Sequence, residues 1–131
     1  MGKKCASVVL DPCLQYLEDN TDRISVCEGE PSTYEHATST KGTGNGKKLA
    51  MSSTPTFTGP AAGDGGGSSR KTTVDAEPTI TVDASGDADH VALCKSGTST
   101  WLYTTTCTLQ ALVAANTVTI PAWDIEIGSP S

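Results

Sequence analysis

The sequence is poor in aromatic residues, with one phenylalanine, three tyrosines and two tryptophans among 131 residues. Aromatic side chains normally supply a large share of core burial. A chain of this length buries only about two thirds of the surface that it exposes when unfolded. We therefore expect a single small domain with a thin core, to which association with a partner can add stability.

The sequence also lacks long apolar runs and clusters of basic residues. No run approaches the roughly 20 residues of a membrane helix, and the short apolar run near the N-terminus is broken at Asp11 and Pro12. Nine basic residues face fifteen acidic ones, which gives a net charge of −6. From the lack of long apolar runs we expect no membrane partner and no signal peptide. Because binding to nucleic acid needs clustered Lys and Arg, we also expect no nucleic-acid partner. The excess of acidic residues predicts a solvated acidic surface or one that meets a basic partner.

The five cysteines contain no C-x-x-C pair, which argues against zinc-ribbon and thioredoxin-like sites. In an oxidising environment the odd number leaves at least one thiol for a bond between chains, whereas in the cytosol all five would be small buried side chains. Cys5 and Cys13, near a terminus, are the predicted inter-chain disulfide candidates. Cys94 and Cys107 fall on expected strands and are predicted to be inert core positions, unless their strands adjoin and they pair with each other.

The pattern of apolar residues changes along the chain. A helix is predicted from about 11 to 20, with Asp11 as its cap and Pro12 in its first position. The Gly-rich region from about 28 to 69 is predicted to be mostly irregular, as an extended arm or long surface loops, with KLAMSS and TFT as candidate short strands. From Arg70 onward, short segments with period two predict strands, among them two neighbouring strands that share the letters TVDA.

The predicted fold class is all-β: a small β-sandwich or barrel with one short N-terminal helix and a long irregular arm. The expected organisation is a helix plus arm over residues 1–69 and a β-rich body over 70–131, within a single domain.

Three local motifs resemble known sites but lack the residues or the spacing that those sites need. The segment KGTGNGKK has Lys41 and Lys48 where a phosphate-binding P-loop needs Gly and Ser or Thr. The segment DASGDAD lacks the spacing of a calcium-binding loop and favours a turn. His90 and Cys94 lie four residues apart, about 13 Å along a strand, which is too far for a hydrogen bond, and the other histidine, His36, is remote in sequence. No metal and no cofactor is expected.

The segment WDIEI alternates strictly and places Asp124 and Glu126 on one face of a strand, about 6 to 7 Å apart. Paired carboxylates at such distances occur in glycoside hydrolases, but this chain has few residues from which to build a substrate cleft. The favoured interpretation is that both carboxylates lie on the solvent-exposed face of a half-buried strand. Trp123, Ile125 and Ile127 are then predicted to form an apolar face, buried within the body or against a sister chain. No catalytic residue is predicted, and the protein is not expected to be an enzyme.

The stretch ADHVALCKSGTSTWLYTTTCTLQALVAANTVTIPAWDIEIGSP resembles the C-terminal half of a family of small virion proteins of tailed bacteriophages and prophages. The shared features are the HVAL strand, a Ser/Thr/Gly turn, a strand with the Trp101-Leu102 pair, and the ending NTVTIPAWDIEI followed by Gly and Pro130. The helix LDPCLQYLEDNTDRISVC and the segment EPSTYEHATST also resemble the opening of that family. The cysteines depart from the family pattern, and no catalytic motif is part of it.

This resemblance implies a structural virion protein, made in the cytoplasm of the bacterial host. The leading expectation is a capsid decoration or linking (cement) protein that is located on the capsid surface and binds the major capsid protein. Such proteins are commonly small, β-rich and trimeric, which implies a homotrimer. A tail, neck or host-receptor-binding component is the alternative, because small β-domains serve all of these roles.

Overall fold

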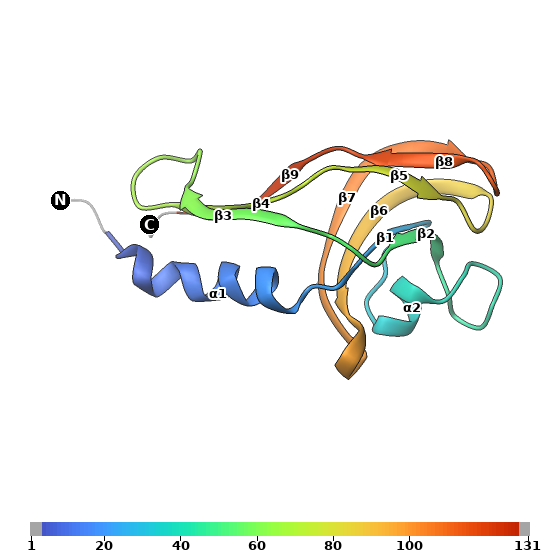
Figure 1. Cartoon of the computed structure of the whole chain (residues 1–131), viewed down its shortest axis with the longest axis horizontal. Helices are drawn as coiled ribbons and strands as arrows, with labels where there is room; N and C mark the ends of the chain where they lie inside the picture. Colours follow the sequence, from blue (N-terminus) through green and yellow to red (C-terminus); the bar gives the residue numbers. More distant parts are fainter. Residues whose placement is uncertain (1–3, 129–131) are drawn as a thin grey trace. The chain divides into compact units, whose positions relative to one another are not determined.

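The structure, a computed structural model that describes residues 4–128, consists mainly of antiparallel strands (Figure 1). In chain order, its elements are α1 (Ser7–Asn20), β1 (Arg23–Cys27), α2 (Tyr34–Thr38), β2 (Lys48–Ser52), β3 (Phe57–Ala62), β4 (Arg70–Val74), β5 (Glu77–Thr81), β6 (Gly86–Lys95), the 3₁₀ turn η1 (Ser96–Thr98), β7 (Thr100–Leu112), β8 (Thr117–Ile120) and β9 (Trp123–Ile127).

The predicted β-rich class with one short N-terminal helix is confirmed, and most of the region from 28 to 69 is irregular as expected, with the candidate strands KLAMSS and TFT found in β2 and β3. The region from 28 to 69 contributes α2, β2 and β3. Gly59 and Pro60 of this region lie inside β3, at an irregularity in the β3–β4 register. Gly and Pro are tolerated in strands at such bulges and at sheet edges, so a Gly-rich composition did not prevent strand formation here.

The chain divides into two units that are interleaved in sequence. We call Met1–Asn20, Thr56–Ala76 and Pro121–Ser131 the helix–hairpin unit, and Thr21–Pro55 and Glu77–Ile120 the β unit. This division differs from the expected boundary between residues 69 and 70. The two TVDA strands, β4 and β5, belong to different units and do not pair with each other, contrary to the prediction.

The β unit contains a four-stranded antiparallel sheet in the order β2-β1-β6-β7 and a two-stranded sheet of β5 and β8. A single bridge between Ala50 and Val82 links β2 to the end of β5. Four of the five residues of β1 are buried, as expected for a central strand that is covered on both faces. Ala37 of α2 packs with Ala92 and Cys94 of β6. This unit holds most of the buried apolar residues of the part of the chain that the structure describes.

The helix–hairpin unit consists of α1 and a three-stranded antiparallel sheet in the order β3-β4-β9. Helix α1 contacts β3 and β4 (Figure 1). Among the described residues, only three apolar side chains of this unit are buried: Leu14 of α1, Val74 of β4 and Ile125 of β9. Thr72 of β4, directly opposite Ile125 in the register, is also fully buried. The core of this unit is therefore very small.

Helix α1 begins four residues earlier than the sequence predicted. Pro12 lies inside the helix and not at its first position. The N–H of Val9 donates to the carbonyl oxygen of Ala6 (2.9 Å) and starts the first turn. A proline removes one backbone hydrogen bond from a helix interior, so contacts with the sheet must offset its cost. Within residues 4–128, no helix combines the length and the apolar composition that crossing a membrane requires.

Candidate interaction surface on helix α1

The inner side of α1 is fixed to the sheet of its unit by one apolar contact and one ion pair. Leu14 is buried. Nε of Arg70 donates to Oδ1 of Asp11 (2.7 Å), and the second arm of the guanidinium donates to Oδ2 (3.2 Å). Just before the helix, the N–H of Cys5 donates to Oγ of Ser68 (3.2 Å). A two-armed Arg–carboxylate pair fixes orientation as well as charge, so α1 has a defined rotation about its axis.

This rotation leaves an apolar face in solvent over residues 8–16, while the exposed Asp19 in the last turn lies within the same arc. Val8, Val9 and Tyr16 are 77%, 61% and 55% exposed, and Pro12 and Cys13 are also exposed. At about 100° per residue, these five positions fall within about 140° around the helix. We call these five residues the outer face of α1. Surface helices normally present charged or polar side chains to solvent, so a face of this composition is typical of a contact with another protein.

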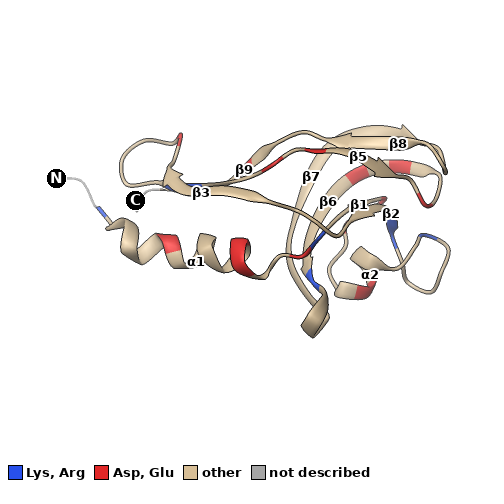
Figure 2. Cartoon of the chain, in the orientation of Figure 1, with Lys and Arg blue, Asp and Glu red and all other residues tan. Residues whose placement is uncertain are grey.

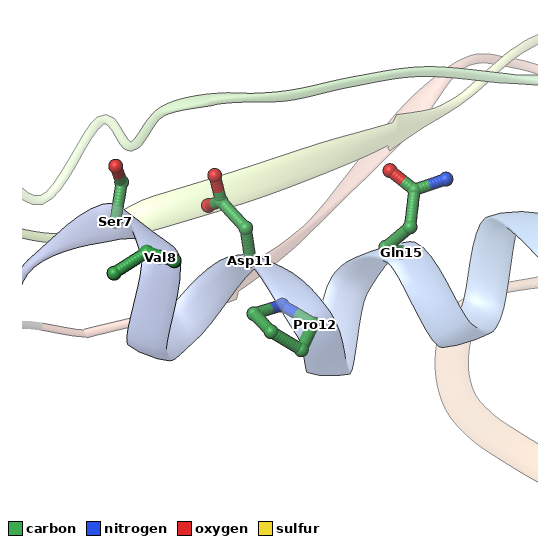
Figure 3. Close-up of a pocket in the computed structure, with 5 residues that line it drawn as sticks. All are labelled: Ser7, Val8, Asp11, Pro12 and Gln15. Atoms are coloured by element: carbon green, nitrogen blue, oxygen red, sulfur yellow. The ribbon is translucent and has the colours of Figure 1, made fainter.

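An open hollow of about 480 Å³ borders this face, and its lining includes Ser7, Asp11 and Gln15. These three residues follow one another at intervals of four and project from the same side of the helix, and Val8 and Pro12, which also line the hollow, lie on the adjacent side (Figure 3). Asp11 is already paired with Arg70. No convergent set of reactive groups lines the hollow, so its chemistry is that of a docking surface.

The five cysteines are all free, and each lies within the described residues. Cys13 is exposed on the outer face of α1, and Cys5 is half-buried before the helix. Cys27 and Cys94 are buried, and burial raises the pKa of their thiols to about 12 and about 11. The prediction of an inert core position therefore fits Cys94. It is wrong for Cys107, which is exposed because β7 is the edge strand of its sheet.

Strand β9 places the predicted apolar face toward the small core of the helix–hairpin unit. Ile125 is 6% exposed, and Trp123 and Ile127 are half-buried. They lie opposite Thr72, Val74 and Arg70 of β4 in an unbroken antiparallel register. Within the described chain, this face serves the core of its own unit.

The carboxylates of Asp124 and Glu126 lie on the other side of β9 and are both occupied. Oδ1 of Asp124 accepts a hydrogen bond from Oγ1 of Thr73 (2.7 Å), and Oδ2 lies 3.2 Å from Nζ of Lys71. Oε1 of Glu126 accepts the N–H of Gly65 (2.7 Å). These hydrogen bonds, first that of Thr73 and then that of Lys71, lower the pKa of Asp124, and the bond from Gly65 lowers the pKa of Glu126. An acid–base pair needs one member with a raised pKa, which neither carboxylate has; they hold the β3–β4 loop to β9.

One arrangement was missed by the sequence analysis: Cys27 of β1 lies directly opposite His90 of β6. Nδ1 of His90 is 2.7 Å from Oδ1 of Asp89, which also accepts the N–H of Gly29 (2.8 Å). The order Cys, His, Asp is that of a nucleophilic triad. However, the Cys27 thiol is fully buried and its pKa is raised by that burial, so it stays protonated and its role is packing. Strand register, which a single sequence does not reveal, created this pairing.

The lysines of the remaining motifs are held by ion pairs, one of which includes the buried Lys48. Lys41 pairs with Glu28, and Nζ of Lys48 lies 2.9 Å from Oδ2 of Asp83. His36 lies on α2, with its Nδ1 3.4 Å from the backbone N of Ser32. Among residues 4–128, no three Asp, Glu, His or Cys side chains are grouped as a metal site. The outer face of α1 is therefore the candidate functional site.

Comparison with known proteins gives this surface no precedent: no protein-family profile, no curated protein and no solved structure matches the chain.

Proposed function

We propose that this protein is a structural component of the virion of a tailed bacteriophage, and specifically a capsid decoration or cement protein that forms a homotrimer and binds the major capsid protein. The observation that carries the proposal is the outer face of α1, which is apolar and exposed. The identity of the partners comes from the resemblance of the segment ending in NTVTIPAWDIEI to small virion proteins. The same resemblance supports a location on the capsid surface.

The physical argument starts from the small core of the helix–hairpin unit. With three buried apolar side chains among its described residues, this unit gains little from its own burial. Apolar surface removed from water contributes about 25 cal/mol per Å². Contact of Val8, Val9 and Tyr16 with sister chains would therefore stabilise both the unit and the assembly. We assign the outer face of α1 to contacts between sister chains in the trimer.

Cys13 lies in the middle of this face, so the proposal extends to a disulfide between chains. The exposed thiol would meet a sister chain when the outer faces pack together. The bond would form after release from the reducing host cytosol, when two thiols lose two electrons to an external oxidant such as oxygen. Cys5, half-buried before α1, is the second candidate.

We also propose that the antiparallel sheets of the β unit form a small sandwich or barrel. Both sheets contribute buried side chains, for example Leu93 from the four-stranded sheet and Ile80 from the β5–β8 pair. A closed or two-layered arrangement would cover the apolar faces of both sheets.

The oligomer is tested with two variants of the first turn of α1. Val9→Asp places a charge on the outer face, whereas Ser7→Asp places the same charge in the same turn but off that face. Both charges are compatible with the dipole of a helix N-terminus, so only the contact with sister chains differs. Light scattering is expected to show loss of threefold association for Val9→Asp and its retention for Ser7→Asp. A wild-type chain that shows no threefold association would refute the trimer.

The location is tested on purified phage particles. Cryo-electron microscopy is expected to show the chain as a regular array on the capsid surface. Density for the chain in the tail or neck would refute the cement role and establish the alternative virion role. Gel electrophoresis without reductant, with thiols blocked at lysis, is expected to show linked chains that Cys13→Ser abolishes. A gel without reductant that shows single chains and no linked species would contradict the disulfide.

A further inference from the structure

Strand β7 forms an open edge of the four-stranded sheet. It spans Thr100–Leu112 and is the longest strand in the described chain, with β6 paired along one side (Figure 1). No strand among residues 4–128 pairs with its other side. An edge of this kind presents unpaired backbone N–H and C=O groups, which are a template for another extended chain.

This edge lacks charge and proline, two of the features that usually prevent strand addition. Proteins protect sheet edges with charged residues, proline, short strands or bulges. The sequence of β7, TWLYTTTCTLQAL, contains no charged residue, no proline and no glycine, and its ribbon is uncharged along its whole length (Figure 2). The strands at other sheet edges differ: β2 begins with Lys48, β3 contains Pro60, β9 carries Asp124 and Glu126, and β8 has four residues.

The irregularities in β7 favour a second copy of this chain as the partner that pairs with the open edge. The register between β6 and β7 shifts at two places, between Ala88 and His90 and between Leu93 and Cys94. Such bulges bend a strand, and β6 and β7 are visibly curved in Figure 1. Rotation by 180° about an axis perpendicular to a sheet leaves the face toward which its strands bend unchanged. A second β7, related by such an axis, is therefore bent toward the same face as the first. An unrelated extended peptide would have to adopt this bend when it binds.

The sequence of β7 is compatible with antiparallel pairing to itself. Thr106 is the central residue of the thirteen, so an axis at Thr106 gives the greatest overlap. In this register Thr106 faces its own copy, and residues 103–105 fall opposite 107–109, the three residues at which the β6–β7 register shifts. Oγ1 of Thr104 keeps its hydrogen bond to the carbonyl oxygen of Pro31 (3.0 Å) within its own chain. Tyr103 falls opposite Leu109, which is 63% exposed in the single chain. An aromatic side chain opposite an apolar one is a favourable cross-strand pair.

We propose that β7 pairs antiparallel with β7 of a second copy about a two-fold axis at Thr106, which joins two four-stranded sheets into one sheet of eight strands. This contact uses another surface than the outer face of α1 and does not depend on the virion role. Where the α1 contact makes a trimer, the β7 contact links one trimer to the next. An isologous two-fold contact closes after two copies, so each edge has one partner.

The decisive experiment measures self-association in a Val9→Asp background, which removes the α1 contact. Light scattering is expected to show a dimer in this background. Adding Thr106→Lys, or separately Thr106→Asp, places like charges directly opposite each other and is expected to give a monomer. A one-to-one mixture of the two variants is expected to restore the dimer, because Lys now faces Asp. The matched control is Thr81→Lys on β5, also an exposed strand threonine, which is expected to stay dimeric.

A cysteine variant tests the register independently of charge. In a Cys5→Ser, Cys13→Ser, Cys107→Ser background, Thr106→Cys is expected to cross-link spontaneously, since directly opposed Cα atoms in antiparallel strands lie about 4.5 to 5.5 Å apart. The native Cys107 residues would be about 8 Å apart in this register, beyond disulfide reach. A wild-type β7 that stays monomeric in the Val9→Asp background overturns the proposal. Folded Lys and Asp variants that fail to recombine, or a Thr106→Cys chain that does not cross-link, also overturn it.

Discussion

Replacing Thr72 by valine is expected to stabilise the helix–hairpin unit. Thr72 lies in the middle of β4 with no exposed surface, opposite Ile125 of β9. Its hydroxyl oxygen is buried and has no hydrogen-bond partner among the described residues. A buried polar group without a partner costs about 1 to 3 kcal/mol. Valine has the same branched shape and replaces the hydroxyl with a methyl group, which removes that cost.

The expected gain follows from two terms. Removal of the unpaired hydroxyl contributes about 1 to 3 kcal/mol, and burial of one more methyl group contributes up to about 0.8 kcal/mol. Crowding in a fully buried site reduces the sum, so we expect a net gain of about 1 to 2 kcal/mol in the free energy of unfolding. For a chain of this size, that corresponds to a rise of about 3 to 8 °C in Tm.

The neighbouring threonine supplies the matched control. Oγ1 of Thr73 donates to Oδ1 of Asp124 (2.7 Å) on the exposed side of the same strand. Thr73→Val removes a hydrogen bond that is made, so it is expected to leave stability unchanged or to lower it slightly. Calorimetry and thermal circular dichroism of both variants make the comparison. A Thr72→Val protein that melts below the wild type would refute the reasoning, because it would mean that the hydroxyl is satisfied in solution.

Three further outcomes are expected. Leu14→Ala should cost about 2 to 5 kcal/mol and make α1 the first site of limited proteolysis; unchanged cleavage would contradict the assigned core. Hydrogen bonds lower the pKa of Asp124 in the folded protein, so its contribution to stability is present at neutral pH and is lost as the pH falls from about 5 through its folded pKa. Asp124→Asn should therefore flatten the pH dependence of Tm in this window. An unchanged pH profile would argue against the contacts. Mass spectrometry after brief alkylation of the native protein should find Cys107 labelled and Cys27 labelled only after unfolding, and rapid labelling of Cys27 would show that its site opens.

The sequence was informative where the local pattern and the environment agreed. Leu10, Leu14 and Leu17 follow one another at intervals of four and three, which predicts an inner face for α1, and Leu14 is buried. Strict alternation in β9 predicted which side chains turn inward, and Ile125 is buried while Asp124 lies on the opposite side with Lys71 and Thr73. In these elements a single period decides which side chains face the core.

The sequence was misleading where distant contacts decided the outcome. The two TVDA strands do not pair, and the Asp75 carboxylate at the end of β4 accepts hydroxyl hydrogen bonds from Thr56 and Thr58 (2.9 and 2.8 Å), which fix that end beside β3. Cys107 is exposed because β7 lies at an edge and its register is interrupted. The outer face of α1 could have been recognised from Val8, Val9 and Tyr16, whose spacing completes a second apolar side of the helix.

The interleaving of the two units also bears on synthesis. Helix α1 leaves the ribosome early, but β9, which supplies one of the three apolar core side chains of the helix–hairpin unit, is the last described strand to appear. Strands β3 and β4, which contact α1, appear before β9. At about 5 to 20 residues per second, the unit therefore waits for several seconds between β4 and β9 with its core incomplete and the outer face of α1 in water. During this interval, the outer face can be covered by chaperones or by other copies on the same polysome. Assembly of sister chains and completion of the fold are thus expected to be coupled in time.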